Sequence, residues 1–400
     1  MGRGRRCGVP QNQCVLPDHD WHQGVNTYKF EVQYAPVDDF RVRAGYQRAI
    51  RAPNIVELFT PQSFGTISAP SIDPCAPTRD PVTGVLTPAT ATLAQCQHTG
   101  VTAAQYGNGG TTNSIPQCTA LQCAQLMGGN IALKPEKSDS ITIGVNITPR
   151  ALPNLSASID YYRIKLTDTV GTISATIILQ NCLATGDPTY CQLISRTAAG
   201  SIAGSSVTTG GYITQTSLNV GAAKVEGIDV QTSYKAPVGE RFGTLVFNLS
   251  GSALLKNKTT PIPGAPTYDC AGLYGPTCLT VNPRWRHNLR MTWVSPWDVQ
   301  VSAYWRYIGQ VSLDSNSSDP SLSNGNVDAF DATMKAQNYF DLSAAWRPTK
   351  VLELRAGVNN LFDRDPPVVS ANVVTSGAAN SIPVYDQLGR QLFIAFTAKY

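Results

Sequence analysis

Residues 389–400 read GRQLFIAFTAKY, and this stretch carries the pattern that decides the fold. In an extended chain every second side chain lies on the same face, and one face of this stretch is apolar. That face holds Leu392, Ile394, Phe396, Ala398 and Tyr400. The other face is polar or small except at Phe393, which interrupts the alternation. Such a strand, ending on an aromatic residue, is typical of a barrel wall with lipid outside and a polar lumen inside.

The composition excludes several classes of protein. Charged residues make up only 14% of the 400 residues, against about a quarter in soluble globular proteins. No apolar run approaches the roughly 20 residues that a membrane helix needs, which excludes a helical membrane protein. The net charge of +4 is small and scattered, and this argues against nucleic acid as a partner.

Alternation along the chain predicts a series of strands joined by two kinds of connection. We expect strands at residues 24–36, 38–51, 135–148, 154–168, 211–236, 241–256, 280–295, 298–312, 337–347, 351–361 and 389–400. Short turns centred on proline alternate with long loops rich in Gly, Ser, Asn and Pro. The long loops are expected at 52–134, 169–210, 257–279, 313–336 and 362–388. This asymmetry predicts an all-β fold, an antiparallel transmembrane β-barrel with tight periplasmic turns and long extracellular loops.

The direction of the last strand depends on residues 211–236. If they form one tall strand, the predicted strands alternate so that Tyr400 lies at the periplasmic edge. A break at Gly221 would reverse that direction. We predict a single strand here.

The strand faces agree with a wet interior. Along residues 40–47 the apolar residues alternate with Arg41, Arg43, Gly45 and Gln47, and along 298–307 with Gln300, Ser302, Tyr304 and Arg306. An arginine on the lipid face near the middle of the bilayer costs about 2–4 kcal/mol, so we expect these residues to face the lumen. Packing of an ordinary β-sandwich is the structural alternative, and the loop asymmetry argues against it.

The ten cysteines follow the same topology. All are predicted outside the strands and on the loop side; they are Cys7, Cys14, Cys75, Cys96, Cys118, Cys123, Cys182, Cys191, Cys270 and Cys278. Disulfides formed in an oxidising compartment explain this placement. The natural pairs are Cys7–Cys14, Cys182–Cys191 and Cys270–Cys278, whereas the four cysteines of loop 52–134 allow three pairings. Zinc held by Cys118 and Cys123, or by Cys7, Cys14, His19 and His22, is the alternative that we disfavour.

Three further segments carry a family resemblance. They are GYQRAIRAPNIVELF at 45–59, AAKVEGIDV at 222–230 and GVNNLFDRDP at 357–366. Together with the terminal strand they resemble the carboxy-terminal barrel half of TonB-dependent outer-membrane receptors. The resemblance implies a 22-stranded barrel with an amino-terminal plug, in the outer membrane of a Gram-negative bacterium. It also implies active uptake of a scarce nutrient with energy relayed by TonB. The terminal strand, through Leu392, Ile394, Phe396 and Tyr400, resembles the signal that the barrel-assembly machinery recognises.

The chain also departs from the family pattern. The amino end, MGRGRRCGVPQNQ, lacks the apolar core of a secretory signal. We therefore interpret residues 1–23 as a truncated extracellular-loop segment and residues 24–400 as a partial barrel of about eleven strands. The plug, the TonB box and the early strands are expected to be missing, and the chain alone is not expected to transport.

Six residues are the candidates for contact with a ligand in the lumen or loops: Arg41, Arg43, Gln47, Arg51, Tyr304 and Arg306. For the lumen arginines the expected partners are carboxylates of the plug and wall. For Arg51, anchoring of the adjacent loop is the expected role. Residues 359–363 are expected to end a strand and anchor its turn rather than to bind ligand.

Two rival functions remain open on the sequence. One is a passive porin-like or adhesive barrel, and the other is a secreted β-rich enzyme such as a glycosidase. The enzyme is disfavoured because the sequence has no Gly-x-Ser-x-Gly, no His-Glu-x-x-His and no phosphate loop. We predict no catalytic residue, no cofactor and no metal. The polar loops, without concentrated Arg or His, disfavour haem or a strongly anionic chelate and leave sugars and neutral siderophores open.

Overall fold

The computed structural model describes residues 26–67, 72–80, 82–107, 113–118, 122–262, 264–323, 325, 327–370, 382 and 384–398. Its strands are β1 (Tyr28–Val37), β2 (Phe40–Arg51), β3 (Ser63–Ile67), β4 (Thr78–Arg79), β5 (Leu86–Thr87), β6 (Cys123–Gly128), β7 (Glu136–Ile147), β8 (Leu155–Gly171), β9 (Ile194–Ser195), β10 (Tyr212–Thr216), β11 (Leu218–Pro237), β12 (Thr244–Thr260), β13 (Tyr268–Asp269), β14 (Leu273–Tyr274), β15 (Trp285–Val294), β16 (Val299–Ile308), β17 (Val311–Leu313), β18 (Thr333–Met334), β19 (Gln337–Trp346), β20 (Leu352–Asn359) and β21 (Gln391–Ala398). Its helices are α1 (Ile55–Phe59), α2 (Leu93–His98), α3 (Ala103–Tyr106), α4 (Ala175–Thr185), α5 (Pro188–Cys191) and the 3-10 helix η2 (Asp314–Asn316).

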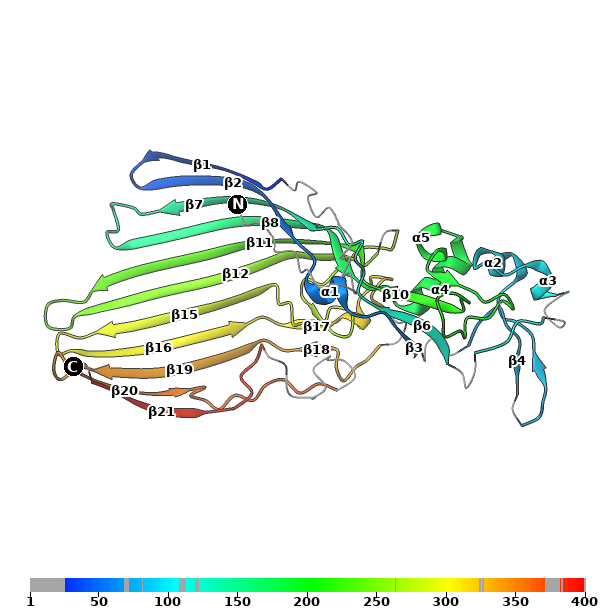
Figure 1. Cartoon of the computed structure of the whole chain (residues 1–400). Helices are drawn as coiled ribbons and strands as arrows, with labels where there is room; N and C mark the ends of the chain where they lie inside the picture. Colours follow the sequence, from blue (N-terminus) through cyan, green and yellow to red (C-terminus); the bar gives the residue numbers. More distant parts are fainter. Residues whose placement is uncertain are drawn as a thin grey trace, which may run out of the picture.

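One large antiparallel sheet dominates the molecule (Figure 1). Its strands follow the order β1-β2-β7-β8-β11-β12-β15-β16-β19-β20-β21, and the short β13 pairs with β12. Each long strand pairs with the long strands that precede and follow it along the chain, as in a series of hairpins. The predicted all-β, antiparallel fold is confirmed.

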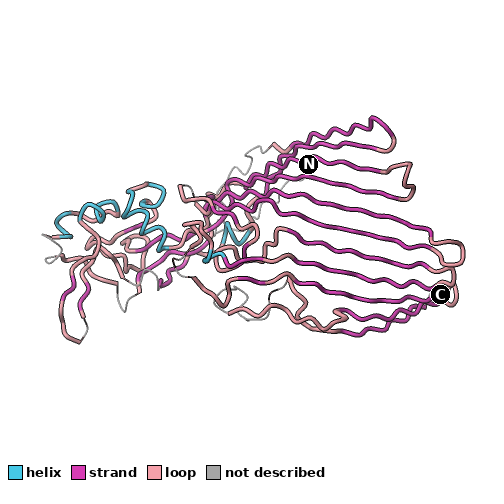
Figure 2. The backbone as a smooth tube through the Cα atoms, turned by 180° about the vertical axis from the view of Figure 1, so that it is seen from behind, coloured by secondary structure: helices cyan, strands magenta, loops and turns pink. Residues whose placement is uncertain are grey.

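The two ends of the sheet differ as predicted. The short connections β1–β2, β7–β8, β11–β12, β15–β16 and β19–β20 lie at one end, and the long connections with all the helices lie at the other (Figures 1 and 2). Asn154 and Asp298, in two of the short turns, have φ angles of 72° and 55°. Asn and Asp tolerate this left-handed conformation better than other residues with a side chain, so the sequence fits these turns.

The outward face of the sheet is apolar and exposed. In β21, Leu392, Ile394 and Phe396 are 78%, 81% and 67% exposed, far more than apolar side chains of a soluble core. Their inward neighbour Phe393 lies over Gly357 of the paired strand β20, where a Cβ would come within 2.6 Å of the ring. The glycine therefore provides the space that lets one aromatic residue face inward. Tyr400, the last residue of the predicted assembly signal, lies outside the described residues.

The prediction of a single strand at 211–236 is wrong in one respect. The segment divides at Ser217 into β10 and β11. β10 leaves the large sheet and pairs in parallel with β6, whereas β11 runs unbroken between β8 and β12. Because β11 still contributes one crossing, the alternation of directions along the large sheet is preserved.

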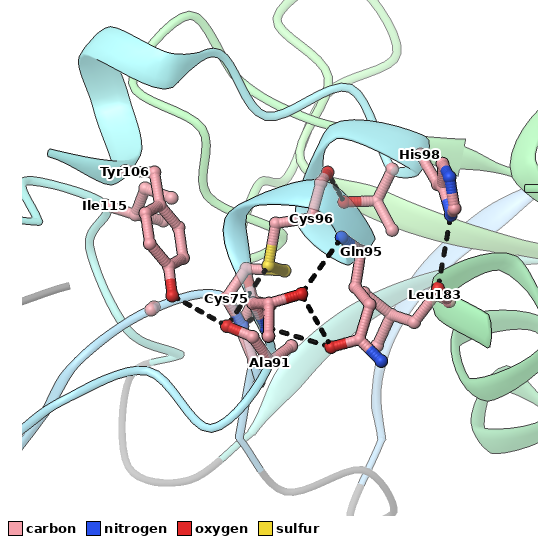
Figure 3. The surroundings of a disulfide bond; sticks show 12 residues. Cys75, Ala91, Gln95, Cys96, His98, Tyr106, Ile115 and Leu183 are labelled. Atoms are coloured by element: carbon pink, nitrogen blue, oxygen red, sulfur yellow. Dashed lines mark hydrogen bonds between the residues drawn. A yellow bond between two sulfur atoms is a disulfide. The ribbon is translucent and has the colours of Figure 1, made fainter. Parts of the chain in front are cut away.

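The loops expected at 52–134 and 169–210 are not simply polar connections. Together with β10, their described residues form a packed unit, the distal lobe, which comprises β3–β6, β9, β10 and α2–α5. Its core includes Ile178, Leu179, Ile202 and Ile213, all at most 1% exposed. The disulfide Cys75–Cys96 lies in this core beside Tyr106, whose hydroxyl donates a hydrogen bond to the carbonyl of Ala91 (Figure 3). A hydrophobic core of its own thus stabilises the distal lobe beyond the sheet.

Four disulfides join described residues. They are Cys75–Cys96, Cys118–Cys123, Cys182–Cys191 and Cys270–Cys278. The last two are the expected pairs, and the first two select one of the three pairings that were open in loop 52–134. Cys7 and Cys14, with the segment 1–23, lie outside the described residues. Among the described helices, none has the length and apolarity that crossing a bilayer requires.

Candidate functional site

The inward face of the large sheet is polar and hollowed. A cavity of about 800 Å³ opens on it across seven neighbouring strands, from β2 to β16. The lining residues are Arg43, Asn146, Ser156, Ala157, Ser158, Gln231, Thr232, Ser233, Asn248, Leu249, Ser250, Asn288, Arg290 and Tyr304. Neutral hydroxyl and amide groups dominate, so this surface can form hydrogen bonds to a polar ligand or to a polar protein segment.

Arg43 lies in this cavity but is already paired. Its Nε and Nη2 donate to the two carboxylate oxygens of Asp160 at 2.8 and 2.6 Å. The pair reaches from β2 to β8 across the intervening strand β7, where Gly144 leaves room for it. Arg43 thus faces the lumen as expected, but a bidentate bond to another residue of the wall fixes its guanidinium.

Tyr304 and Arg290 form a second feature of the same face. The guanidinium of Arg290 lies over the ring of Tyr304, 4.8 Å from its centroid. The two residues face each other across β15 and β16, and both also line a neighbouring cavity of about 330 Å³. Arg290 forms no ion pair with a described residue, so its charge is compensated only by the ring. The Arg290 guanidinium can therefore still bind a group in the large cavity.

At the loop end of the sheet, Arg306 connects the wall to the loop before β21. Its guanidinium donates to Asp341 at 3.0 and 2.9 Å and to Asp386 at 2.8 Å. It also lies over the ring of Tyr339, 5.1 Å from the centroid. Because Asp386 lies near the end of loop 362–388, Arg306 holds this described part of the loop against the lumen wall.

Arg51 has the anchoring role that was expected of it. Its guanidinium binds Glu136 at the start of β7 and Glu57 in α1. The side chains of Asn54 and Glu57 cap α1 reciprocally, each accepting from the backbone of the other. The bond to Arg51 lowers the pKa of the Glu57 carboxyl. The segment RAPNIVELF therefore ties the beginning of loop 52–134 to its end.

The segment GVNNLFDRDP also forms a structural turn. Asn360 is fully buried, and its side chain accepts from the backbone N–H of Arg364 and donates to the Arg364 carbonyl. The Asp363 carboxylate accepts from the backbone N–H of Arg390 at 2.7 Å. This bond lowers the pKa of the Asp363 carboxyl. The turn thereby fixes the entry to β21.

The charge of Asp363 gives the entry to β21 a pH dependence. In the folded protein the pKa of this carboxyl lies below its unfolded value of about 4. The charged carboxylate therefore contributes stability above about pH 4, and this contribution is lost as the pH falls through the lowered pKa. We expect Asp363→Asn to reduce the hydrogen-exchange protection of the Arg390 amide at pH 7. As the pH falls from about 4 through the lowered pKa, the difference from the wild type should shrink. Asp365→Asn is the matched control and should leave the Arg390 protection unchanged; equal effects of the two variants would contradict the assignment.

The structure thus divides the six candidates. Arg43 and Tyr304 line one cavity, whereas Arg51 and Arg306 anchor loops. Arg41 and Gln47 lie on β2 with exposed side chains. The sequence reasoning missed Arg290 and the amides of Asn248 and Asn288, although alternation along the strands predicted at 241–256 and 280–295 could have placed all three inward.

A zinc site at Cys118 and Cys123 is not compatible with the structure, because the two sulfurs are bonded to each other. Within the described part of the chain, no group of three or more His, Cys, Asp or Glu is arranged to hold a metal ion.

Comparison with known proteins gives one family and a set of similar structures. Residues 9–361 match the family described as TonB dependent receptor-like, beta-barrel. A mutant ferric enterobactin receptor from Pseudomonas aeruginosa in complex with enterobactin aligns with a TM-score of 0.54 and 16% identity, covering 93% of this chain and 40% of that one. A siderophore receptor from Acinetobacter baumannii aligns with a TM-score of 0.49 and 14% identity, covering 94% and 41%. No curated protein matches the sequence. The chain spans less than half of the length of these receptors.

Proposed function

Because the chain belongs to the TonB-dependent receptor β-barrel family of the Gram-negative outer membrane, we propose that it forms part of the wall of an active importer for a scarce nutrient of the siderophore or oligosaccharide type. The observation that carries this proposal is the inward cavity of about 800 Å³, whose lining is mostly polar. Such a lining suits a large hydrated ligand or a polar plug, whereas a sheet face that packs against an apolar core would be lined by apolar side chains.

The charges on this face bear on the ligand class. Arg43 and Arg306 are neutralised by Asp160, Asp341 and Asp386, whereas Arg290 forms no ion pair with a described residue. The same holds for Arg286 and Arg355, which line the adjoining cavities. The hydroxyl and amide groups of the lining favour a ligand rich in hydrogen-bonding groups. Of the two nutrient types we favour the siderophore, since a receptor of similar fold binds enterobactin.

The edges of the sheet bear on whether the chain works alone. Among the described strands, β1 and β21 each pair on one side only. An unpaired strand edge exposes backbone N–H and C=O groups, which is prohibitive in the hydrocarbon of a bilayer. We therefore propose that the chain needs further strands and a plug to complete a barrel, that TonB energises the complete receptor and that the barrel-assembly machinery inserts it.

Uptake of a radiolabelled ferric siderophore by cells that lack their own siderophore receptors tests this function. Cells that make only the 400-residue chain are expected to take up no more label than empty cells. Supplying a plug and early strands of the same receptor is expected to give uptake that stops when TonB is deleted. Uptake by the chain alone that persists without TonB would instead support the passive porin-like barrel.

The same assay tests the binding face with a matched pair of variants in the complemented receptor. Tyr304 faces the cavity, whereas Tyr307 on the same strand faces outward. Tyr304→Ala is expected to lower the uptake efficiency about tenfold, as for one lost stacking or hydrogen-bonding contact. Tyr307→Ala should leave it within about twofold; the reverse order would refute a role of the inward face.

A further inference from the structure

The outward face of the large sheet carries an uncommon row of lysines. Lys165 on β8, Lys224 on β11 and Lys258 on β12 are direct cross-strand neighbours. Arg163 and Lys256 lie in the adjacent row on the same face, on either side of Glu226. We call these five cations the basic belt. Like charges that lie directly opposite each other on a sheet are destabilising, so this arrangement requires a compensating anion.

The protein itself supplies too little negative charge for the basic belt. Glu226 contacts Lys224 at 2.5 Å, Lys256 at 3.1 Å and Arg163 at 3.7 Å, so one carboxylate is shared among three cations. The neighbouring Asp139 is already held by both nitrogens of the Arg48 fork.

Two lysines of the belt have no carboxylate of their own: Asp139, which lies opposite Lys165, is held by Arg48. Lys165 and Lys258 form no ion pair with a described residue. Asp269 lies opposite Lys258 but directs its Oδ1 atom to the backbone N–H groups of Asn257 and Ala271. The belt therefore retains an excess of positive charge on a surface that faces away from the lumen.

The height of the belt identifies what it meets. Lys165 lies ten residues beyond Leu155, where β8 starts at the short turn. At about 3.4 Å per residue and a strand tilt of about 40°, this corresponds to roughly 25 Å for Lys165. The same arithmetic from Pro237 and Thr244 gives roughly 35 Å for Lys224 and Lys258, so the row lies at or beyond the edge of an apolar band of about 25 Å. The next outward row toward the turn, Ile143, Tyr161 and Ile228, is apolar or aromatic. The belt thus lies at the headgroup level on the loop side, which is the outer leaflet.

We propose that the basic belt binds the phosphate groups of a phosphorylated glycolipid of the outer leaflet. The shared carboxylate of Glu226 holds Lys224, Lys256 and Arg163 in place, and Lys165 and Lys258 supply the uncompensated charge. Ammonium groups bind phosphate oxygens as point charges, and basic clusters at headgroup height attract anionic lipids. This lipid contact is separate from the uptake of nutrient through the lumen.

The test measures the retention of bisphosphorylated lipid A by the protein purified in detergent, by mass spectrometry of the lipid bound per protein. Lys165→Gln/Lys258→Gln is expected to retain about tenfold less lipid than the wild type, because two charges near the headgroups are lost. The control Lys235→Gln/Lys350→Gln removes the same charge at the turn end and should retain as much as the wild type. Lys165→Arg/Lys258→Arg keeps the charge and should also retain the lipid, which separates a loss of charge from a loss of fold.

The source of the phosphate is distinguished in two further arms. Dephosphorylated lipid A should not be retained, and inorganic phosphate at millimolar concentration should displace the intact lipid only weakly, since the acyl chains also contact the apolar row. Equal retention by the two Gln variants would overturn the proposal. Equal retention of the dephosphorylated lipid would overturn it too, and full displacement by inorganic phosphate would reject the lipid as the occupant.

Discussion

Replacement of Arg196 by methionine is expected to destabilise the distal lobe by about 3–5 kcal/mol. Arg196 and Asp73 form an ion pair in which the two side chains are only 4% and 0% exposed. The same guanidinium donates to the Thr99 hydroxyl at 2.9 Å and to the Gly200 carbonyl at 2.6 Å. Removing it leaves the Asp73 carboxylate uncompensated in a dry core, where an unpaired charge is far costlier than at the surface.

Pulse proteolysis in increasing urea measures this effect on the complemented receptor in outer-membrane vesicles, because the lobe lies on the loop side (Figure 1). Asp73→Asn/Arg196→Met should be less destabilised than Arg196→Met, since no charge then remains buried. Arg347→Met is the matched control, because its ion pair with Glu353 is exposed and such pairs contribute at most about 1 kcal/mol. Similar cleavage midpoints for Arg196→Met and Arg347→Met would show that the buried pair does not stabilise the lobe.

The large sheet was predictable because each of its strands carries its own periodic pattern. Alternation identified which face of β2 holds Arg43 and which face of β21 holds Leu392, and it needed no knowledge of the neighbouring strands. The order of strands followed from the alternation of short and long connections. Register did not follow, because the pairing of Arg43 with Asp160 joins residues 117 positions apart.

The distal lobe was harder to predict for a related reason. Its helices are short, and its sheet brings β6 beside β10 from a distant part of the chain. The break at Ser217 follows from this non-local pairing of β10 with β6. One local pattern was available: Ser174 caps an apolar segment, ATIILQNCLAT, that forms the buried helix α4. Apolar residues in an otherwise polar loop were the observable sign of a second core.

The functional face shows the same division between local and non-local information. The inward direction of Arg43, Tyr304 and Arg306 came from alternation, but their capacity to bind a ligand depends on partners from other strands and loops. Arg43 and Arg306 are neutralised by carboxylates, whereas Arg290 has only an aromatic ring. A lumen arginine is therefore a candidate ligand contact only where the wall leaves its charge uncompensated.

Substitution of Gly144 by alanine is expected to destabilise the sheet by about 1–3 kcal/mol, although alanine is the smallest possible side chain. A Cβ at this position would overlap Asp160 Oδ1, and it would lie 2.8 Å from Asp160 Cγ and 3.0 Å from Arg43 Nε. Both side chains are held by their bidentate bond, so neither can move without breaking it. The urea midpoint of the protein in detergent, followed by tryptophan fluorescence, measures the loss.

Gly171→Ala on β8 is the matched control, because the nearest atom to its added Cβ is 4.0 Å away, which is ordinary contact. This variant should shift the stability by less than about 0.5 kcal/mol. Adding Asp160→Ala to Gly144→Ala removes the clash, so the double variant should be more stable than the sum of the two single effects predicts. If Gly144→Ala instead behaves like Gly171→Ala, or if the effects of Gly144→Ala and Asp160→Ala simply add, the Arg43–Asp160 bond does not depend on the space at Gly144. The wall arginine would then be free to turn into the lumen and would regain its place among the ligand contacts.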